Sequence, residues 1–160
     1  MNHVRFRLTR EALTLSQGEL AEALGVSKRV LARWEGGQES VPEARLEQLE
    51  KLAEEFHGAI NRRADTLLAL IEERKMDYVI MPVYMSDAEY RAVDWPGGDI
   101  WPTAKMMRQM IYRIVAAVEA KTAAEILLIP FDLENYQDWL AESGEADNTQ
   151  NRSVWAAMQA

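Results

Sequence analysis

Residues 16–37 constrain the fold more than any other stretch, because they predict two short helices joined by a tight turn. Ser16 can cap the first helix, and Glu19 lies three residues later as its capping-box partner. Gly25 then supplies a left-handed residue at a position where a Cβ would clash. Ser27 can cap the second helix. The stretch therefore predicts a helix, a turn and a second helix within 22 residues.

Each of these two helices has one apolar face. In the first helix, Leu20, Ala21 and Leu24 fall on one side, and Ala21 is small where the two helices must approach closely. The inward stripe of the second helix consists of Val30, Leu31 and Trp34, and its outward side carries Lys28, Arg29, Ala32 and Arg33. A short helix with an exposed basic side is the layout that can enter the major groove of DNA.

These residues resemble the helix-turn-helix of the Cro/CI-type regulators, also called the XRE family. The similarity runs from about Leu8 to Leu52 and includes Pro42, which opens a fourth helix. It rests on several restricted positions at fixed spacing: Ser16, Gln17, Leu20, Ala21, Leu24, Gly25, Val26, Ser27, Arg33, Trp34, Glu35 and Gly36. The resemblance implies a lambda-repressor-like helical bundle that binds DNA.

The resemblance also implies which residues contact DNA: Gln17, Ser27, Lys28, Arg29, Val30, Ala32 and Arg33. Gln17 and Ser27 would meet phosphate, and the three basic residues would reach base edges or phosphate. Arg29 and Arg33 are the best candidates for guanine contacts, although a phosphate contact suits either of them nearly as well. Val30 departs from the family pattern, because an apolar side chain can read only a thymine methyl group.

The net charge of −8 is unusual for a DNA-binding chain, but the acidic residues are unevenly distributed. Residues 1–40 hold six Lys and Arg against five Asp and Glu, whereas residues 76–160 hold six against thirteen. The acidic excess therefore lies away from the predicted reading helix. We expect modest, salt-sensitive affinity for each subunit, so tight binding would require a homodimer.

Composition excludes several other classes of protein. The chain of 160 residues can hold one or two small domains, and without cysteine it has no disulfide and no thiol nucleophile. Its longest apolar run, Ile126–Ile129, is too short to cross a bilayer, and we expect a cytoplasmic protein. His3 and His57 have no partners suited to a metal site or a catalytic triad, and no phosphate-binding glycine loop is present. We expect no enzyme, no cofactor and no metal.

Residues 42–75 are predicted to be helical throughout. Apolar residues recur every three or four positions from Leu46 to Ile71, which is the amphipathic pattern. Pro42 suits the first turn of this helix, and Ser40 is a candidate cap. Because the pattern is long for one globular helix, Gly58 is a candidate break.

The pattern changes after Lys75. Residues 78–84 and 125–131 are two β-prone runs, each with a Pro near its end that favours an edge strand. Each run precedes a capped helix that contains a Tyr, and a further helix is predicted over residues 103–121. This order of strand, helix, loop, helix, strand and helix predicts a small α+β unit. It fits either an internal duplication or two strand-to-helix turns, and we favour the second.

This half resembles the second half of the YdiL-like regulators and of the anti-CRISPR-associated (Aca) autorepressors. The matching features are the Tyr-containing helix at 86–93, the Pro-Gly-Gly turn at 96–98, and a Trp101-led helix with Val115-Ala116-Ala117. The resemblance implies a homodimer formed by this half. The predicted dimer-interface residues are Trp101, Met107, Met110, Ile111, Ile114 and Val118.

We therefore predict a mainly α chain, in which a lambda-repressor-like helix-turn-helix bundle precedes a small α+β dimerisation domain. The predicted domains are residues 1–75 and 76–142, followed by a polar tail over 143–160. Within that tail, a short helix could dock through Val154, Trp155 and Met158.

The predicted function is a sequence-specific transcriptional regulator, a homodimeric repressor that reads an inverted repeat in double-stranded DNA through residues 27–35. The alternative is an antitoxin-like interaction protein whose acidic C-terminal half binds a protein partner. The Trp95–Trp101 loop fits a ligand pocket or a partner contact, but covering the core or the dimer seam explains it better. A small effector is a third hypothesis, for which the sequence offers no pocket chemistry.

Overall fold

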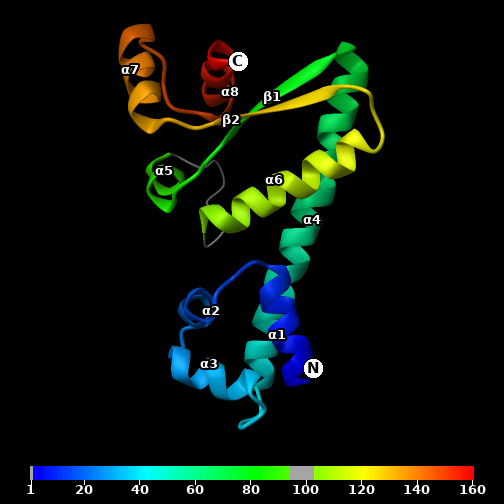
Figure 1. Ribbon diagram of the computed structural model, residues 1–160, viewed down its shortest axis with the longest axis vertical. Helices are drawn as coiled ribbons and strands as arrows, with labels where there is room; N and C mark the ends of the chain where they lie inside the picture. Colours follow the sequence, from blue (N-terminus) through cyan, green and yellow to red (C-terminus); the bar gives the residue numbers. More distant parts are fainter. Residues whose placement is uncertain (1, 94–102) are drawn as a thin grey trace. The chain divides into compact units, whose positions relative to one another are not determined.

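The computed structural model describes residues 2–93 and 103–160 of the chain. Helices dominate these residues and form two compact units, Met1–Asn61 and Arg62–Ala160 (Figure 1). The prediction of a mainly α chain with an N-terminal helix-turn-helix and a small sheet is confirmed. The two units divide within one long helix, whereas the sequence placed the boundary after Lys75, because helical periodicity runs through both.

The N-terminal unit is built from four helices. They are α1 (His3–Ala12), α2 (Gln17–Ala23), α3 (Lys28–Glu35) and the first part of α4 (Glu43–Arg74). Its core is apolar, and its fully covered side chains include Phe6, Leu20, Leu31, Leu49 and Phe56. Each of the four helices thus contributes at least one side chain to the same core.

The predicted caps explain where α2 and α3 begin. The Ser16 hydroxyl accepts a hydrogen bond from the Glu19 N–H, and the Glu19 carboxylate accepts one from the Ser16 N–H, which completes the capping box. The Ser27 hydroxyl accepts from the Val30 N–H at the start of α3. Gly25 has φ +65°, so the predicted left-handed residue between the two helices is confirmed. The predicted steric clash is wrong, because an added Cβ would meet no atom within 4 Å, and only the backbone conformation favours glycine.

Helix α4 runs without interruption over 32 residues, so the candidate break at Gly58 is wrong. One glycine within a helix costs only about 1 kcal/mol relative to alanine, and the buried Phe56, Ala59 and Ile60 on either side hold the helix in place. Pro42 precedes the helix rather than opening its first turn, and its carbonyl accepts from the Leu46 N–H. None of the described helices combines the length and the apolar character that crossing a membrane requires.

The C-terminal unit follows the predicted order of elements. After the second part of α4 come β1 (Tyr78–Val83), α5 (Asp87–Ala92), α6 (Ala104–Glu119), β2 (Glu125–Pro130), α7 (Leu133–Ser143) and α8 (Thr149–Gln159). The hydroxyl groups of Ser86 and Thr103 and the carboxylate of Asp132 cap α5, α6 and α7. Capping therefore fixes the start of each helix that follows a strand or loop in this unit.

Strands β1 and β2 pair in parallel, with Tyr78 opposite Glu125 and Val83 opposite Pro130. Parallel strands need a long connection, and α5 and α6 lie within it. The described sheet has only these two strands, so both are edge strands and each tolerates its proline.

Aromatic side chains form the core beside the strand ends. The ring of Phe131 lies 4.7 Å from that of Tyr84, 5.1 Å from Tyr136 and 5.3 Å from Trp155, measured between centroids. Trp155 comes from α8, and its indole N–H donates to the Asn135 side chain at 2.8 Å. The last helix is therefore part of the C-terminal unit.

The face through which α8 docks differs from the prediction. Trp155 is buried as expected, but Val154 and Met158 are 45% and 64% exposed. Arg152 and Ala156 are buried in their place. Burial of a charged side chain rotates the docking face relative to the face that the apolar residues alone indicate.

The predicted dimer-interface residues on α6 are buried within the chain itself. Met107, Met110, Ile111, Ile114 and Val118 are each less than 7% exposed. They form part of the core of the C-terminal unit, and Met107, Ile111 and Ile114 also line a cavity in it, so their place in a dimer interface stays a prediction. Trp101 and the Trp95–Trp101 loop lie outside the described residues.

Candidate nucleic-acid interface

Helix α3 presents a basic outer surface because its inner surface is fixed in the core. Leu31 is fully buried, and the Trp34 ring packs edge-on against Phe6 with 6.2 Å between centroids. Val30 is half-buried. The exposed residues of the helix are Lys28, Arg29, Ala32 and Arg33. The side chains predicted to face outward therefore do so.

A buried charge network fixes the end of α3 against α1 and α2. The Glu35 carboxylate accepts from the Arg10 guanidinium, with 2.5 Å from Nε and 3.1 Å from Nη2. The third nitrogen, Nη1, donates to the Leu15 carbonyl at 2.6 Å. The side chains of Arg10 and Glu35 are only 9% and 3% exposed. A buried pair with this geometry permits one arrangement of the two helices and disfavours others.

Gln17 joins the same network. Its amide nitrogen Nε2 donates to Glu35 at 2.8 Å, so α2 is attached to the end of α3 through the same carboxylate. A primary amide has two N–H groups, and the second one remains for a phosphate oxygen. The predicted phosphate contact at Gln17 is thus compatible with its position in the network.

Sequence reasoning did not identify Arg10 and Glu35 as members of this site. A usable signal was present, because Glu35 follows Leu31 and Trp34 at a spacing of four and one and so belongs to the inward face. An acid on an inward helical face requires a buried partner.

Arg33 is paired on the surface. Its guanidinium lies 2.7 Å from the Glu39 carboxylate, and the two side chains are 47% and 39% exposed. An ion pair with this exposure contributes at most about 1 kcal/mol, so a phosphate or a guanine can replace Glu39 at little cost. The ion pair between Arg33 and Glu39 is therefore readily exchangeable.

The turn after α3 depends on Gly37. This residue has φ +68°, and a Cβ there would lie 3.3 Å from the imidazole ring of His3. A side chain at this position would strain the backbone and press against α1. The glycine thus allows the chain to pass close to the N-terminus of α1 as it leaves the candidate reading helix.

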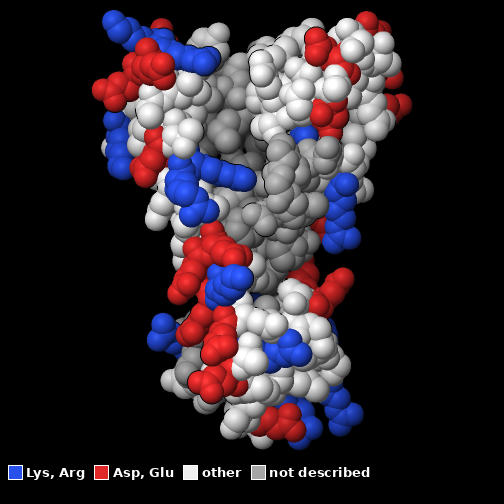
Figure 2. Space-filling model, turned by 180° about the vertical axis from the view of Figure 1, so that it is seen from behind, with Lys and Arg blue, Asp and Glu red and all other residues white. Residues whose placement is uncertain are grey.

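The first part of α4 is acidic on its exposed side. Glu43, Glu47, Glu50 and Glu54 are all exposed. Figure 2 shows red side chains gathered in a column over the N-terminal unit, where Figure 1 places this helix. A helix with that charge repels phosphate, so within this unit α3 offers the more favourable surface for DNA.

The comparisons with known proteins agree with this geometry. Residues 6–57 match the family model described as Helix-turn-helix. No curated protein matches the chain. The match shows that the N-terminal unit carries a helix-turn-helix DNA-binding domain of the type found in XRE-family regulators.

This domain supports a DNA-binding protein of the transcription-regulator class. The match ends at residue 57, so the predicted likeness of the C-terminal half to YdiL-like and Aca proteins remains a prediction.

Proposed function

We propose that this chain is a sequence-specific, homodimeric repressor that reads an inverted repeat in double-stranded DNA. The observation that carries the proposal is the matched helix-turn-helix, in which a buried Arg10–Glu35–Gln17 network holds α3 with three basic residues outward. A rigidly held helix can place the same side chains on the same base edges in each binding event.

In the proposed complex, α3 lies in the major groove. Lys28 and Arg29 are exposed on its first turn, and Arg33 exchanges Glu39 for DNA. A bidentate arginine contact to guanine contributes about 1–3 kcal/mol of discrimination against other bases. Gln17 and Ser27 contact phosphate on either side of the groove, which sets the register of the helix.

Two copies of the domain are needed for tight binding, because the N-terminal 40 residues have six basic and five acidic side chains. A symmetric pair would read half-sites about 34 Å apart, or a multiple of that distance. The predicted α6 residues are largely covered by their own unit, so exposed apolar side chains of the C-terminal unit, such as Tyr112 and Leu128, are additional candidates for pairing. By occupying a promoter, such a dimer would block transcription.

Selection of bound sequences from a random double-stranded DNA library tests the proposal. We expect enrichment of an inverted repeat, and Arg33→Ala should relax the preference at one base pair in each half-site. Lys51→Ala is the matched control, because Lys51 is exposed on α4 and its replacement removes the same charge as Arg33→Ala does. A library in which no inverted repeat is enriched would refute the homodimeric reading.

The antitoxin-like hypothesis predicts a protein partner on the acidic C-terminal half. The matched domain supports DNA binding instead, and no feature of residues 2–93 and 103–160 favours such a partner. Purification of the untagged protein from its host tests this alternative, since a stoichiometric second chain would appear only under it.

A further inference from the structure

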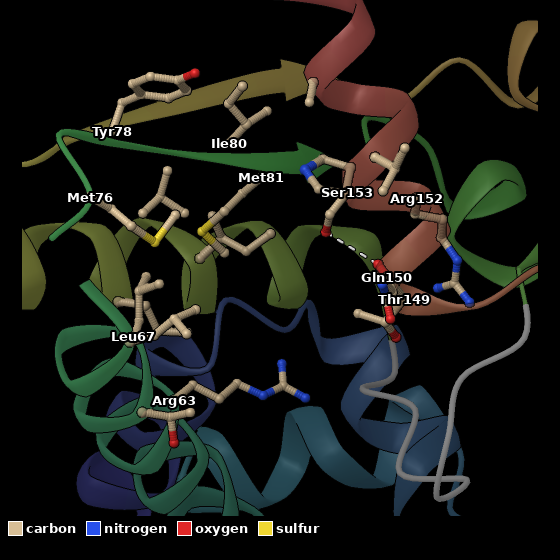
Figure 3. Close-up of a pocket in the computed structure, with 18 of the residues that line it drawn as sticks. Arg63, Leu67, Met76, Tyr78, Ile80, Met81, Thr149, Gln150, Arg152 and Ser153 are labelled. Carbon is tan, nitrogen blue, oxygen red and sulfur yellow. Dashed lines mark hydrogen bonds between the residues drawn. The ribbon is translucent and has the colours of Figure 1, made fainter. Parts of the chain in front are cut away.

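A cavity of about 760 Å³ opens within the C-terminal unit, between α4, β1, α6 and α8. Figure 3 shows these four elements around it, with Leu67 on α4, Met81 on β1 and Ser153 on α8 facing the space. Its volume lies in the range of about 300–1,000 Å³ that is usual for small-molecule sites. The cavity is therefore large enough for a ligand and belongs to one compact unit.

Most of the wall is apolar and adaptable. It includes Leu67, Leu70, Met76, Met107, Ile111 and Ile114. Methionine side chains are flexible and can adjust to ligands of different shape. None of the described residues that line the cavity is acidic, although residues 76–160 hold thirteen Asp and Glu. The wall thus suits an apolar molecule and does not repel an anion.

Two arginines line the cavity, and they differ in their partners. Arg152 is buried and is held by the Asp147 carboxylate at 2.8 Å and by the Tyr84 hydroxyl at 3.5 Å. Arg63 reaches from α4 along the lower side of the cavity toward Thr149 and Gln150 on α8 (Figure 3). Its Nη1 donates to the thioether sulfur of Met110 at 3.7 Å, which is a weak acceptor. Within the part of the chain that the structure describes, Arg63 forms no ion pair with a carboxylate.

The Arg63 side chain is exposed overall, and neighbouring atoms cover part of its guanidinium. Burial lowers the pKa of the Arg63 guanidinium, Tyr90 raises it, and repulsion from the neighbouring Arg62 lowers it again. Because the partner of this guanidinium is a weakly accepting sulfur and not a carboxylate, it can pair with a bound anion without first breaking an ion pair.

We propose that this cavity binds a small amphipathic anion, whose apolar body lies between α4 and α6 and whose carboxylate-like headgroup pairs with Arg63. Thr149 and Gln150 lie on the side of the cavity toward which Arg63 points, and their hydroxyl and amide groups can donate to the same headgroup. A second copy of this chain would need only the apolar wall, whereas the unpaired guanidinium beside an acid-free wall favours an anion. The inference concerns the C-terminal unit and does not rest on DNA binding.

Decanoate is a suitable probe, because it joins one carboxylate to an unbranched apolar chain. Calorimetric titration of the full-length chain, below the concentration at which decanoate forms micelles, should show saturable binding. Arg63→Gln should weaken that binding about three- to fivefold, since it removes an exposed charged hydrogen-bond donor. Arg62→Gln is the matched control, because it removes the same charge from the preceding residue, which does not line the cavity. Decanol should bind the wild-type chain more weakly than decanoate does, and Arg63→Gln should leave the binding of decanol unchanged.

A second variant tests the cavity itself. Ala157 lines it from an exposed position on α8, so Ala157→Trp should fill part of the space and weaken decanoate and decanol alike without unfolding the unit. The proposal is overturned if decanoate does not bind, or if it binds the Arg63→Gln and Arg62→Gln variants equally well. It is also overturned if sedimentation shows a dimer from which Ala157→Trp releases monomers, since a second copy would then occupy the cavity. All titrations are done without DNA, so failure of DNA binding leaves their outcome unaffected.

Discussion

The structure makes a strong prediction about Glu35, whose carboxylate joins three helices of the helix-turn-helix domain. Replacing it in Glu35→Ala deletes two hydrogen bonds from Arg10 and one from Gln17. The Arg10 side chain is only 9% exposed, so its charge would be left buried with the Leu15 carbonyl and, at 3.4 Å, the Glu11 carboxylate as acceptors. Removing one partner of a buried pair costs about 3–5 kcal/mol. That is a large share of the roughly 5–15 kcal/mol by which a whole domain is stable.

The double variant Arg10→Met/Glu35→Leu separates the effect of losing the charges from the effect of losing side-chain volume. It replaces both partners by apolar side chains of similar size, and such replacements are often neutral or stabilising. We therefore expect Glu35→Ala to be much less stable than the double variant. Glu55→Ala is the surface control, because the Lys51–Glu55 pair is 77% and 55% exposed and its loss should cost less than about 1 kcal/mol.

Amide hydrogen exchange is the appropriate assay, because the chain has two compact units and one global melting curve would mix them. Protection in α1–α3 should fall in Glu35→Ala, while α6 in the other unit serves as an internal reference. The reasoning would be refuted if Glu35→Ala changed protection in α1–α3 by less than about 1 kcal/mol, or if the double variant were equally destabilised.

Three further predictions concern single positions. Thr14 has φ +61° and a buried hydroxyl without a described partner, so Thr14→Gly should raise the free energy of unfolding by about 1 kcal/mol, measured by the same exchange assay; a decrease would contradict the strain. Gly37→Ala should lower the free energy of unfolding by about 1–2 kcal/mol. Adding His3→Ala should restore only the part of this loss that comes from contact with the imidazole ring, and full restoration would exclude backbone strain. Burial and the hydrogen bond to Asp147 raise the pKa of Tyr136 from 10.0 to about 12, so the folded unit holds this proton more tightly than the unfolded chain does. The contribution of Tyr136 to stability should therefore be constant below about pH 10 and be lost between about pH 10 and 12. The difference between wild-type and Tyr136→Phe circular dichroism melts at each pH measures it, because the other unit is the same in both proteins; an equal fall in both would contradict the prediction.

Local signals predicted much of the fold. The capping residues Ser16, Ser27, Ser86 and Asp132 each start a helix where the sequence indicated one. Capping depends on atoms within three residues of each other, so short-range sequence contains the needed information. The glycine turn at Gly25 is local for the same reason.

Long-range choices were not predictable in the same way. The sequence indicated both strands, but their direction depends on the path of α5 and α6, and parallel pairing of residues 78 and 125 leaves no local mark. The α6 residues assigned to a dimer show the same limit. An apolar helical face such as that of Met107 and Ile114 indicates burial, but not whether the covering surface belongs to the same chain.

The buried Arg152 shows what hydropathy patterns miss. Arg152 is 1% exposed, yet a pattern that treats charge as a sign of exposure directs α8 through Val154 and Met158 instead. Its partner Asp147 lies just before α8, and Tyr136 on α7 donates to the same carboxylate at 2.9 Å. Burial of Arg152 is favourable only with all three side chains in contact, so no single residue in the sequence predicts it.

The two buried arginine networks perform the same task in different units. Arg10 connects α1 to Glu35, the last residue of α3. Arg152 connects α8 to Tyr84, which follows β1, and to Asp147, which lies between α7 and α8. Apolar packing alone allows helices to slide or rotate at small cost, whereas a buried guanidinium loses several hydrogen bonds if either helix moves. In the N-terminal unit this restriction acts on the helix that carries Lys28, Arg29 and Arg33. Those side chains are exposed, with Arg33 in a surface ion pair, while their helix is fixed at Glu35, so the proposed base reading would be specific even where a small net charge gives weak binding.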